Sequence, residues 1–291
     1  MPTEGRIPYA GGETWYRIVG DGDEPGKLPL LCLHGGPGAL HDYIEPVGEL
    51  SSTGRRVIFY DQIGCGRSWV ERPPETWTVE LFVAEVQAVR DALRLDAVHL
   101  FGSSWGGMLA MEYALTQPDR LSSLVLSSSP ASIPLWAEET ARLVRELPDE
   151  SRRALEASDP ASPEYAAAQE VFYRRHVCRL EPRHDGYLRT MAGVAEHPDV
   201  YHHMQGPNEF VITGTLADWD ITSRLPEIRV PTLITAGRHD EFTPRQAQAV
   251  HEGIRGSELV VFEESSHMQF AEEPERFREV VGTFLERVER E

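Results

Sequence analysis

The sequence predicts an α/β fold in which a doubly wound, mostly parallel sheet carries an inserted group of helices. Short continuous apolar runs, typical of strands covered on both faces, alternate with segments whose apolar residues recur at helical spacing. This alternation stops near residue 130 and resumes near residue 226, with mainly helical patterns between. We therefore expect a core of residues 1–130 and 226–291, and a helical cap of residues 131–225.

The predicted elements follow one another along the whole chain. Residues 14–19 alternate like a strand, and Gly11-Gly12 before them favours a hairpin with residues 6–9. Residues 79–95 carry an apolar stripe at helical spacing, which Thr78 is placed to cap. The other core elements are expected as strands at 30–33, 56–60, 97–101, 121–126, 232–236 and 259–262, and as helices from 108, at 245–254 and at 274–291. The cap is expected to hold helices at 135–147, 163–180 and 187–196.

Length, charge and cysteine content narrow the functional classes. The 291 residues suit one large α/β domain with an insertion. Lys and Arg total 28 against 47 for Asp and Glu, and a formal net charge of -19 repels phosphate backbones and anionic lipid. We expect no nucleic-acid or membrane partner, a cytoplasmic location and, by default, a monomer. The scattered Cys32, Cys65 and Cys178 are expected to be reduced thiols.

Residues 102–107 join a predicted strand to a predicted helix through a serine. The pattern Gly-x-Ser-x-Gly, formed by Gly102, Ser104 and Gly106, is that of a nucleophile elbow, a tight turn that exposes the hydroxyl. Small residues are needed there because a Cβ would collide with the neighbouring element. The first N–H groups of the following helix stabilise negative charge that develops nearby. Ser104 is therefore the candidate nucleophile.

A nucleophilic serine needs a general base, and two later loops offer one. Asp240 follows the strand predicted at 232–236, and His267 follows the strand predicted at 259–262. The chain order Ser104, Asp240, His267 is the order in which a hydrolase of this sheet type assembles a triad. His267 would take the Ser104 proton while Asp240 fixes the imidazole tautomer. Glu241 is the main alternative acid, and five other histidines are expected to be loop, strand or surface residues: His34, His99, His202, His203 and His239.

Stabilising a tetrahedral intermediate takes two aimed hydrogen-bond donors. The N–H of Trp105, directly after the nucleophile, is one of them. The second should come from the glycine-rich loop 34–38, and we assign it to Gly36 because a glycine lets the backbone come close to the oxyanion. The alternative is that this loop is an ordinary turn.

Five short motifs carry a family resemblance. They are HGGPG at 34–38, DQIGCGRS at 61–68, GSSWGG at 102–107, GPNEF at 206–210 and GRHDE at 237–241. Together they resemble the proline iminopeptidases, especially the tricorn-interacting aminopeptidase branch, over nearly the whole chain. The resemblance implies an α/β-hydrolase fold with a helical cap, and hydrolysis of an N-terminal residue from short peptides. It also implies the triad Ser104, Asp240 and His267, with Gly36 and Trp105 at the oxyanion.

The resemblance further assigns the substrate's free amino group to Glu209 in the cap and Glu241 beside the triad acid. Carboxylates near a cleft hold an ammonium group by charge-assisted hydrogen bonds. The alternative is that both are solvated surface residues. Ser103 and Ile63 depart from the family pattern, in which glycine is common at the first position and arginine or leucine at the second. Cap aromatics are expected mainly to pack in the core, with an apolar substrate pocket as their other role: Phe172, Tyr173, Tyr187, Tyr201, Phe210 and Trp219.

These observations lead to one functional expectation with two alternatives. We expect a serine aminopeptidase of the proline iminopeptidase kind that removes proline or another apolar residue from short peptides or amino-acid amides, through an acyl-enzyme on Ser104. No metal or organic cofactor is expected. The alternatives are an amino-acid amidase or esterase with the same triad, and a non-catalytic ligand-binding protein on this fold.

Overall fold

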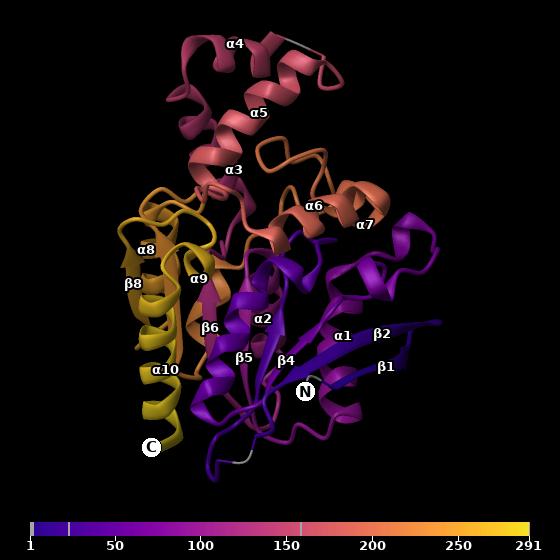
Figure 1. Cartoon of the computed structure of the whole chain (residues 1–291), viewed down its shortest axis with the longest axis vertical. Coiled ribbons are helices and arrows are strands. Elements are labelled where there is room, and N and C mark those ends of the chain that lie inside the picture. Colours follow the sequence, from indigo (N-terminus) through magenta and orange to yellow (C-terminus); the bar gives the residue numbers. More distant parts are fainter. Residues whose placement is uncertain (1–2, 23, 158, 291) are drawn as a thin grey trace.

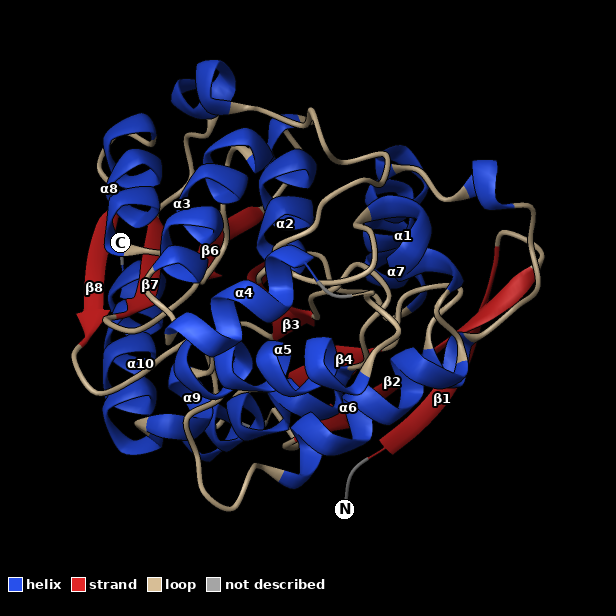
Figure 2. Ribbon diagram, turned by 90° about the horizontal axis from the view of Figure 1, so that it is seen from above, coloured by secondary structure: helices blue, strands red, loops and turns tan. Residues whose placement is uncertain are grey.

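The computed structural model describes residues 3–22, 24–157 and 159–290. Within them, eight strands form a single sheet: β1 (Thr3–Tyr9), β2 (Gly12–Val19), β3 (Leu30–Leu33), β4 (Val57–Tyr60), β5 (Val98–Ser103), β6 (Leu121–Ser127), β7 (Thr232–Gly237) and β8 (Glu258–Phe262). Their spatial order is β1-β2-β4-β3-β5-β6-β7-β8 (Figures 1 and 2). The six strands from β4 to β8 pair in parallel, so the predicted doubly wound, mostly parallel sheet is confirmed.

The first two strands form the predicted hairpin. β1 and β2 pair antiparallel from Thr3 opposite Ile18 to Tyr9 opposite Gly12, and β2 then pairs antiparallel with β4. The connecting turn is made by Ala10 and Gly11, which both have positive φ, as tight hairpin turns require. The hairpin thus extends the parallel sheet at one edge.

The parallel strands are buried because helices cover both faces of the sheet. Every residue of β3, β4, β5 and β7 is buried, which explains their continuous apolar sequences. β8 lies at the far edge and is only partly buried. β5 runs two residues further than the sequence predicted, through Gly102 and Ser103, and so ends directly at the serine turn.

Helices pack on each face and close two apolar clusters (Figure 2). One face carries α1 (Val79–Ala92), α2 (Trp105–Leu115) and α8 (Pro244–Gly253), and the other carries α10 (Pro274–Arg290) with the 3-10 helix η1 (His41–Thr53). The predicted cap of α1 is present, because Thr78 Oγ1 accepts from the N–H of Leu81 at 3.3 Å. Glu291, the last residue of the predicted closing helix, lies outside the described residues. Shorter elements are α9 (Gln269–Glu272), η2 (Gly66–Ser68), η3 (Pro74–Thr76) and η4 (Thr222–Glu227).

Among the described residues between β6 and β7 in the chain, five α-helices lie above the carboxyl ends of the strands (Figure 1). They are α3 (Ile133–Arg145), α4 (Asp149–Ala157), α5 (Pro163–His176), α6 (Asp185–Glu196) and α7 (Asp199–Met204). Three of them, α3, α5 and α6, overlap the predicted helical stripes, but α5 ends at His176 rather than at residue 180. Two helices were not predicted from the sequence: α4, which buries none of its residues and so lacks an apolar stripe, and α7, which has only 6 residues. The division into core and cap stays a prediction.

The cysteines and the lengths of the helices complete the description of the fold. Cys32 in β3, Cys65 in the loop after β4 and Cys178 after α5 are free and buried. In the described ranges, we find no helix with the length and apolar character that a bilayer crossing requires.

Candidate active site

Ser104 lies at the sharp turn between β5 and α2. Its φ of 57° is one that residues other than glycine rarely adopt. A Cβ on Gly102 would lie 2.3 Å from the carbonyl oxygen of Gly106, and a Cβ on Gly106 would lie 2.0 Å from that of Leu33. Only glycine at both positions therefore allows β3, β5 and α2 to approach this closely. The turn places Ser104 at the N-terminus of α2, where the aligned peptide dipoles favour negative charge.

A cavity of about 290 Å³ lies next to this turn. Its wall combines residues of the predicted core, including Gly36, Ser104 and His267, with residues of the helical insertion. The insertion contributes Gln169, Tyr173, Val177, Tyr187, Thr190, Met191, Val194, Ala195, Pro198, Tyr201, His202, Pro207 and Glu209. A substrate in this cavity would therefore touch both parts of the chain.

Asp240 and His267 are joined by a buried hydrogen bond. Nδ1 of His267 lies 2.8 Å from Oδ1 of Asp240, which leaves Nε2 of the ring as the acceptor. The Asp240 carboxylate also accepts from the N–H of Phe242 at 2.8 Å and from Oγ of Ser128 at 2.5 Å. Burial alone lowers the pKa of His267, but the charge and hydrogen bond of Asp240 outweigh it, so the pKa is raised. Asp240 thus stabilises the protonated ring, as a general base requires.

The structure brings Ser104 and His267 to the same cavity wall. The hydrogen bonds of the described residues do not include one between the Ser104 hydroxyl and the His267 ring. In unliganded sites such contacts often shorten only when the substrate binds. The Trp136 ring, from α3, packs against the His267 ring in a T-shaped arrangement with the centroids 6.2 Å apart. The insertion therefore helps to hold the histidine in place.

The two predicted oxyanion donors come from different elements: Gly36 from the loop after β3, and Trp105 from the start of α2, directly after Ser104. Gly36 lines the cavity with a φ of +109°, and Trp105 is the first residue of α2. Among the described hydrogen bonds, none is donated by the backbone N–H of Gly36 or of Trp105. Both groups are therefore available to an oxygen of a bound substrate.

Glu209 and Glu241 both line the cavity. Glu241 is only 1% exposed, and its Oε2 has no hydrogen-bond partner among the described residues. Burial, then the charges of Glu209 and Asp240, raise the pKa of Glu241 well above its usual range. Burial also raises the pKa of Glu209, although the hydrogen bond from Tyr201 and the nearby His267 oppose this. A buried carboxyl oxygen without a partner calls for a donor from the ligand.

Glu209 is presented by a tight turn of the insertion. Oδ1 of Asn208 accepts from the N–H groups of Phe210 at 3.2 Å and Val211 at 2.8 Å, an arrangement typical of asparagine-centred turns. The Tyr201 hydroxyl donates to Oε1 of Glu209 at 2.7 Å. Core packing and an apolar substrate pocket were the two roles expected of Tyr201, and neither includes this hydrogen bond. Nothing in the local sequence shows that its partner lies in the turn that follows.

The cap aromatics divide between the two roles that the sequence left open. Tyr173, Tyr187 and Tyr201 line the cavity, whereas Phe172 and Phe210 pack against each other with ring centroids 5.0 Å apart. Among the other candidate histidines, His202 is exposed but also lines the cavity, which the sequence did not predict. The remaining four are buried or half-buried: His34, His99, His203 and His239. Nδ1 of His99, in β5, lies 2.7 Å from the Ser123 hydroxyl.

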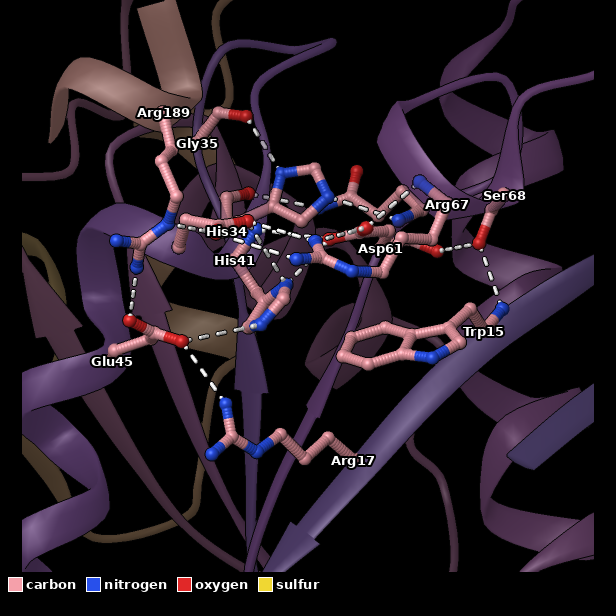
Figure 3. A network of polar contacts seen from close by, with 12 residues as sticks. Trp15, Arg17, His34, Gly35, His41, Glu45, Asp61, Arg67, Ser68 and Arg189 are labelled. Atoms are coloured by element: carbon pink, nitrogen blue, oxygen red, sulfur yellow. Dashed lines mark hydrogen bonds and ion pairs between the residues drawn. The ribbon is translucent and has the colours of Figure 1, made fainter. Parts of the chain in front are cut away.

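A network of ion pairs runs from the loop after β4 to α6 of the insertion (Figure 3). Nδ1 of His41 contacts Asp61 at 2.7 Å, and the Arg67 guanidinium donates to Asp42 at 2.9 Å. Arg189, from α6, donates to Asp42 at 2.7 Å. His41, Asp42 and Glu45 place possible metal-ligand atoms within 4.8 Å of one another. Arg67 and Arg189 already supply the positive charge that these carboxylates need (Figure 3).

The sheet order, the serine elbow and the Asp240–His267 pair define the class of the α/β hydrolases. A model of the α/β-hydrolase fold family matches residues 29–274. The proline iminopeptidase of Saccharolobus solfataricus is 40% identical over 278 residues, which are 94% of this chain and 88% of that protein. The proline iminopeptidase of Thermoplasma volcanium is 39% identical over 98% of this chain and 97% of its own.

A solved structure agrees with these relatives. The crystal structure of proline iminopeptidase from Mycobacterium smegmatis matches with a TM-score of 0.94 at 42% sequence identity, and the match covers 99% of both chains. The chain therefore belongs to the α/β-hydrolase fold family and, within it, to the proline iminopeptidase family.

Proposed function

We propose that this protein is a serine aminopeptidase that removes an N-terminal residue, proline or another apolar one, from short peptides or amino-acid amides. Membership of the proline iminopeptidase family supports the activity. The single observation that carries the specificity for a free amino group is the pair Glu209 and Glu241. Both line the cavity that holds Ser104, and the described lining includes no Lys or Arg to neutralise them. The substrate's ammonium group is the partner that fits this pair.

Acyl transfer follows from the arrangement of the proposed catalytic groups. His267 takes the proton of Ser104 as its oxygen attacks the carbonyl carbon, and the N–H groups of Gly36 and Trp105 bind the resulting oxyanion. The intermediate collapses when the protonated His267 gives its proton to the leaving nitrogen, and the shortened peptide departs. His267 then takes a proton from water, whose oxygen attacks the carbonyl carbon of the acyl-enzyme. The protonated His267 returns this proton to the Ser104 oxygen as the ester bond breaks and the amino acid leaves. Asp240 stabilises the charged ring during both steps.

Amine capture explains why cleavage stops after one residue. An ammonium group held by Glu209 and Glu241 leaves room for a single residue before the carbonyl that meets Ser104. Residues 131–225 act in this proposal as a cap that supplies Glu209 and closes the cavity over the core of residues 1–130 and 226–291. The cytoplasmic location and the monomeric state stay predictions.

The test compares substrates that differ only in their amine. Prolyl-, alanyl- and leucyl-p-nitroanilide are assayed beside their N-acetylated forms and p-nitrophenyl acetate. We expect turnover of the free-amine substrates and none of the acetylated ones. Equal turnover of free and acetylated forms would instead identify an esterase or amidase that ignores the amine. Absence of any turnover, with no labelling of Ser104 by a fluorophosphonate, would identify a ligand-binding protein.

A further inference from the structure

The loop between β4 and η2 carries a glutamine for which the proposed function has no role. We propose that Gln62 is a positioning residue for acyl transfer, which aims the backbone N–H groups of Gly36 and Trp105 at the oxyanion. The inference rests on one part of the proposed function, the formation of an acyl-enzyme on Ser104. It does not depend on the recognition of the substrate's amine.

The Gln62 side chain is buried and bonds to both sides of the oxyanion site. Its Nε2 donates to the carbonyl oxygen of His34 at 2.8 Å. Its Oε1 accepts from the indole Nε1 of Trp105 at 2.9 Å. One amide thus links the residue that begins the Gly36 loop to the residue that supplies the other donor.

The backbone of Gln62 reaches the same loop by a second route, through the His34 ring. The N–H of Gln62 donates to Nε2 of His34 at 2.9 Å, so that nitrogen carries no proton. The ring proton is then on Nδ1, which donates to the carbonyl oxygen of Gly35 at 3.0 Å (Figure 3). Burial lowers the pKa of His34 to about 4, so the ring stays neutral in this tautomer at neutral pH.

The Gly35 carbonyl determines where the Gly36 N–H points. The two groups belong to one planar peptide, and in a trans peptide they point in opposite directions. The Gly35–Gly36 bond is trans, and the N–H of Ala39 also donates to the Gly35 oxygen, at 3.3 Å. Because two donors hold the Gly35 carbonyl, the direction of the Gly36 N–H is already set before a substrate binds. Preorganised donors of this kind do most to stabilise an oxyanion.

Gln62 can act in this way because its neighbours are anchored on both sides. The carboxylate of Asp61 accepts from the N–H of His41 and the N–H of Arg67, both at 3.0 Å. The carboxylate of Glu85 accepts from the N–H of Ile63 at 2.9 Å. The glutamine therefore extends from a backbone that cannot shift freely, as a positioning residue requires.

The test uses Gln62→Met, which keeps the volume and removes both side-chain hydrogen bonds, and Gln62→Asn, which is too short to span both partners. Each is assayed with p-nitrophenyl acetate and with prolyl-p-nitroanilide. We expect kcat to fall roughly 10- to 100-fold on both substrates, with KM within about twofold. The matched control is Ser123→Ala, which removes the buried hydrogen bond to His99 in the sheet, and which should leave kcat unchanged.

The ester separates this inference from the proposed function, because it has no amine to recognise. A loss of kcat on the ester supports the role of Gln62 even if the protein proves not to be an aminopeptidase. Wild-type kcat in a folded variant would overturn the inference, as would a rise in KM with kcat unchanged. Failure of both variants to fold would also overturn it, because Gln62 would then hold the fold rather than the donors.

Discussion

Glu209, from the turn after α7, and Glu241, from the loop after β7, face one cavity, and the charge of Glu209 helps to raise the pKa of Glu241. Burying two carboxylates that repel each other raises the free energy of the protein when no ligand is bound. Their cost is offset when a cation enters. The recognition of a free amine thus has an electrostatic cause that can be tested residue by residue.

Removing either charge should weaken the binding of free-amine substrates. We expect Glu209→Gln and Glu241→Gln each to raise KM for prolyl-p-nitroanilide about 10- to 100-fold, because one charge-assisted hydrogen bond contributes about 1.5–3 kcal/mol. Turnover of p-nitrophenyl acetate should stay near the wild-type rate. Glu263→Gln, which changes an exposed acid that pairs with Arg238, is the matched control. Equal effects on amine and ester substrates would contradict amine capture.

The pH dependence of KM should show the titration of this pair. The pKa values of both carboxyl groups are raised, so acid protonates them before ordinary glutamates and removes the charge that attracts the ammonium group. We therefore expect KM for prolyl-p-nitroanilide to rise as the pH falls below neutrality, with a minimum below the α-amino pKa of about 8. The Glu241→Gln variant should lose most of this acid dependence. A KM for the wild type that does not change from neutral to acid pH would refute the assignment.

Ser104→Ala should abolish nearly all turnover. Loss of a triad nucleophile costs on the order of 10⁶ in kcat. The neighbouring Ser103 provides a matched control, because its buried Oγ has no hydrogen-bond partner among the described residues. Ser103→Ala should keep activity within a few-fold and still react with a fluorophosphonate. Turnover at the wild-type rate by Ser104→Ala would contradict the proposed mechanism.

Acid should destabilise the fold through His34. Burial lowers the pKa of this histidine from 6.5 to about 4. Between these pH values His34 is protonated in the unfolded chain but neutral in the folded protein. The stability contributed by neutral His34 is present above pH 6.5 and is lost as the pH falls towards 4, by about 3 kcal/mol in total. Urea unfolding between these pH values measures the loss. His34→Gln should make the free energy of unfolding depend less steeply on pH. The same substitution at the exposed His202 should leave this pH dependence unchanged.

Much of the fold is predictable because local sequence and burial agree. The continuous apolar runs of β3 and β4 and the capped stripe of α1 each identify their element without knowledge of the rest. η1 could not be found this way. It is a 13-residue 3-10 helix that contains Pro46 and Gly48, and its position is set by packing against the sheet rather than by a helical pattern.

The candidate site is predictable to the extent that it follows from chain order and motif. The order of Ser104, Asp240 and His267 places all three at one edge of a parallel sheet. The contacts of Tyr201 with Glu209, and of Gln62 with His34 and Trp105, join elements that only the folded chain brings together. No spacing in the sequence contains that information. Residues that position others are therefore harder to predict than residues that react.

Weakening the contact between α6 and η1 should let the insertion open more often. The half-exposed Arg189 pairs with the buried Asp42 and the half-buried Glu45, and ion pairs that are partly open to solvent contribute about 1 kcal/mol together. We expect Arg189→Ala to speed hydrogen exchange in α6 and α7 by about fivefold, and added salt to have the same effect on the wild type. Arg153→Ala, which changes an arginine that donates within α4, is the control. Unchanged exchange in α6 would show that other contacts hold the insertion.

The reaction of the three buried thiols with a thiol reagent measures how often the structure around each of them opens. Cys178 lies in the insertion, Cys65 in the loop after β4, and Cys32 in the middle of the sheet. Burial raises the pKa of each, so the reactive thiolate is scarce until the surrounding structure opens. The order in which a thiol reagent modifies them therefore reports, without any introduced label, whether the insertion, the loop or the sheet opens first.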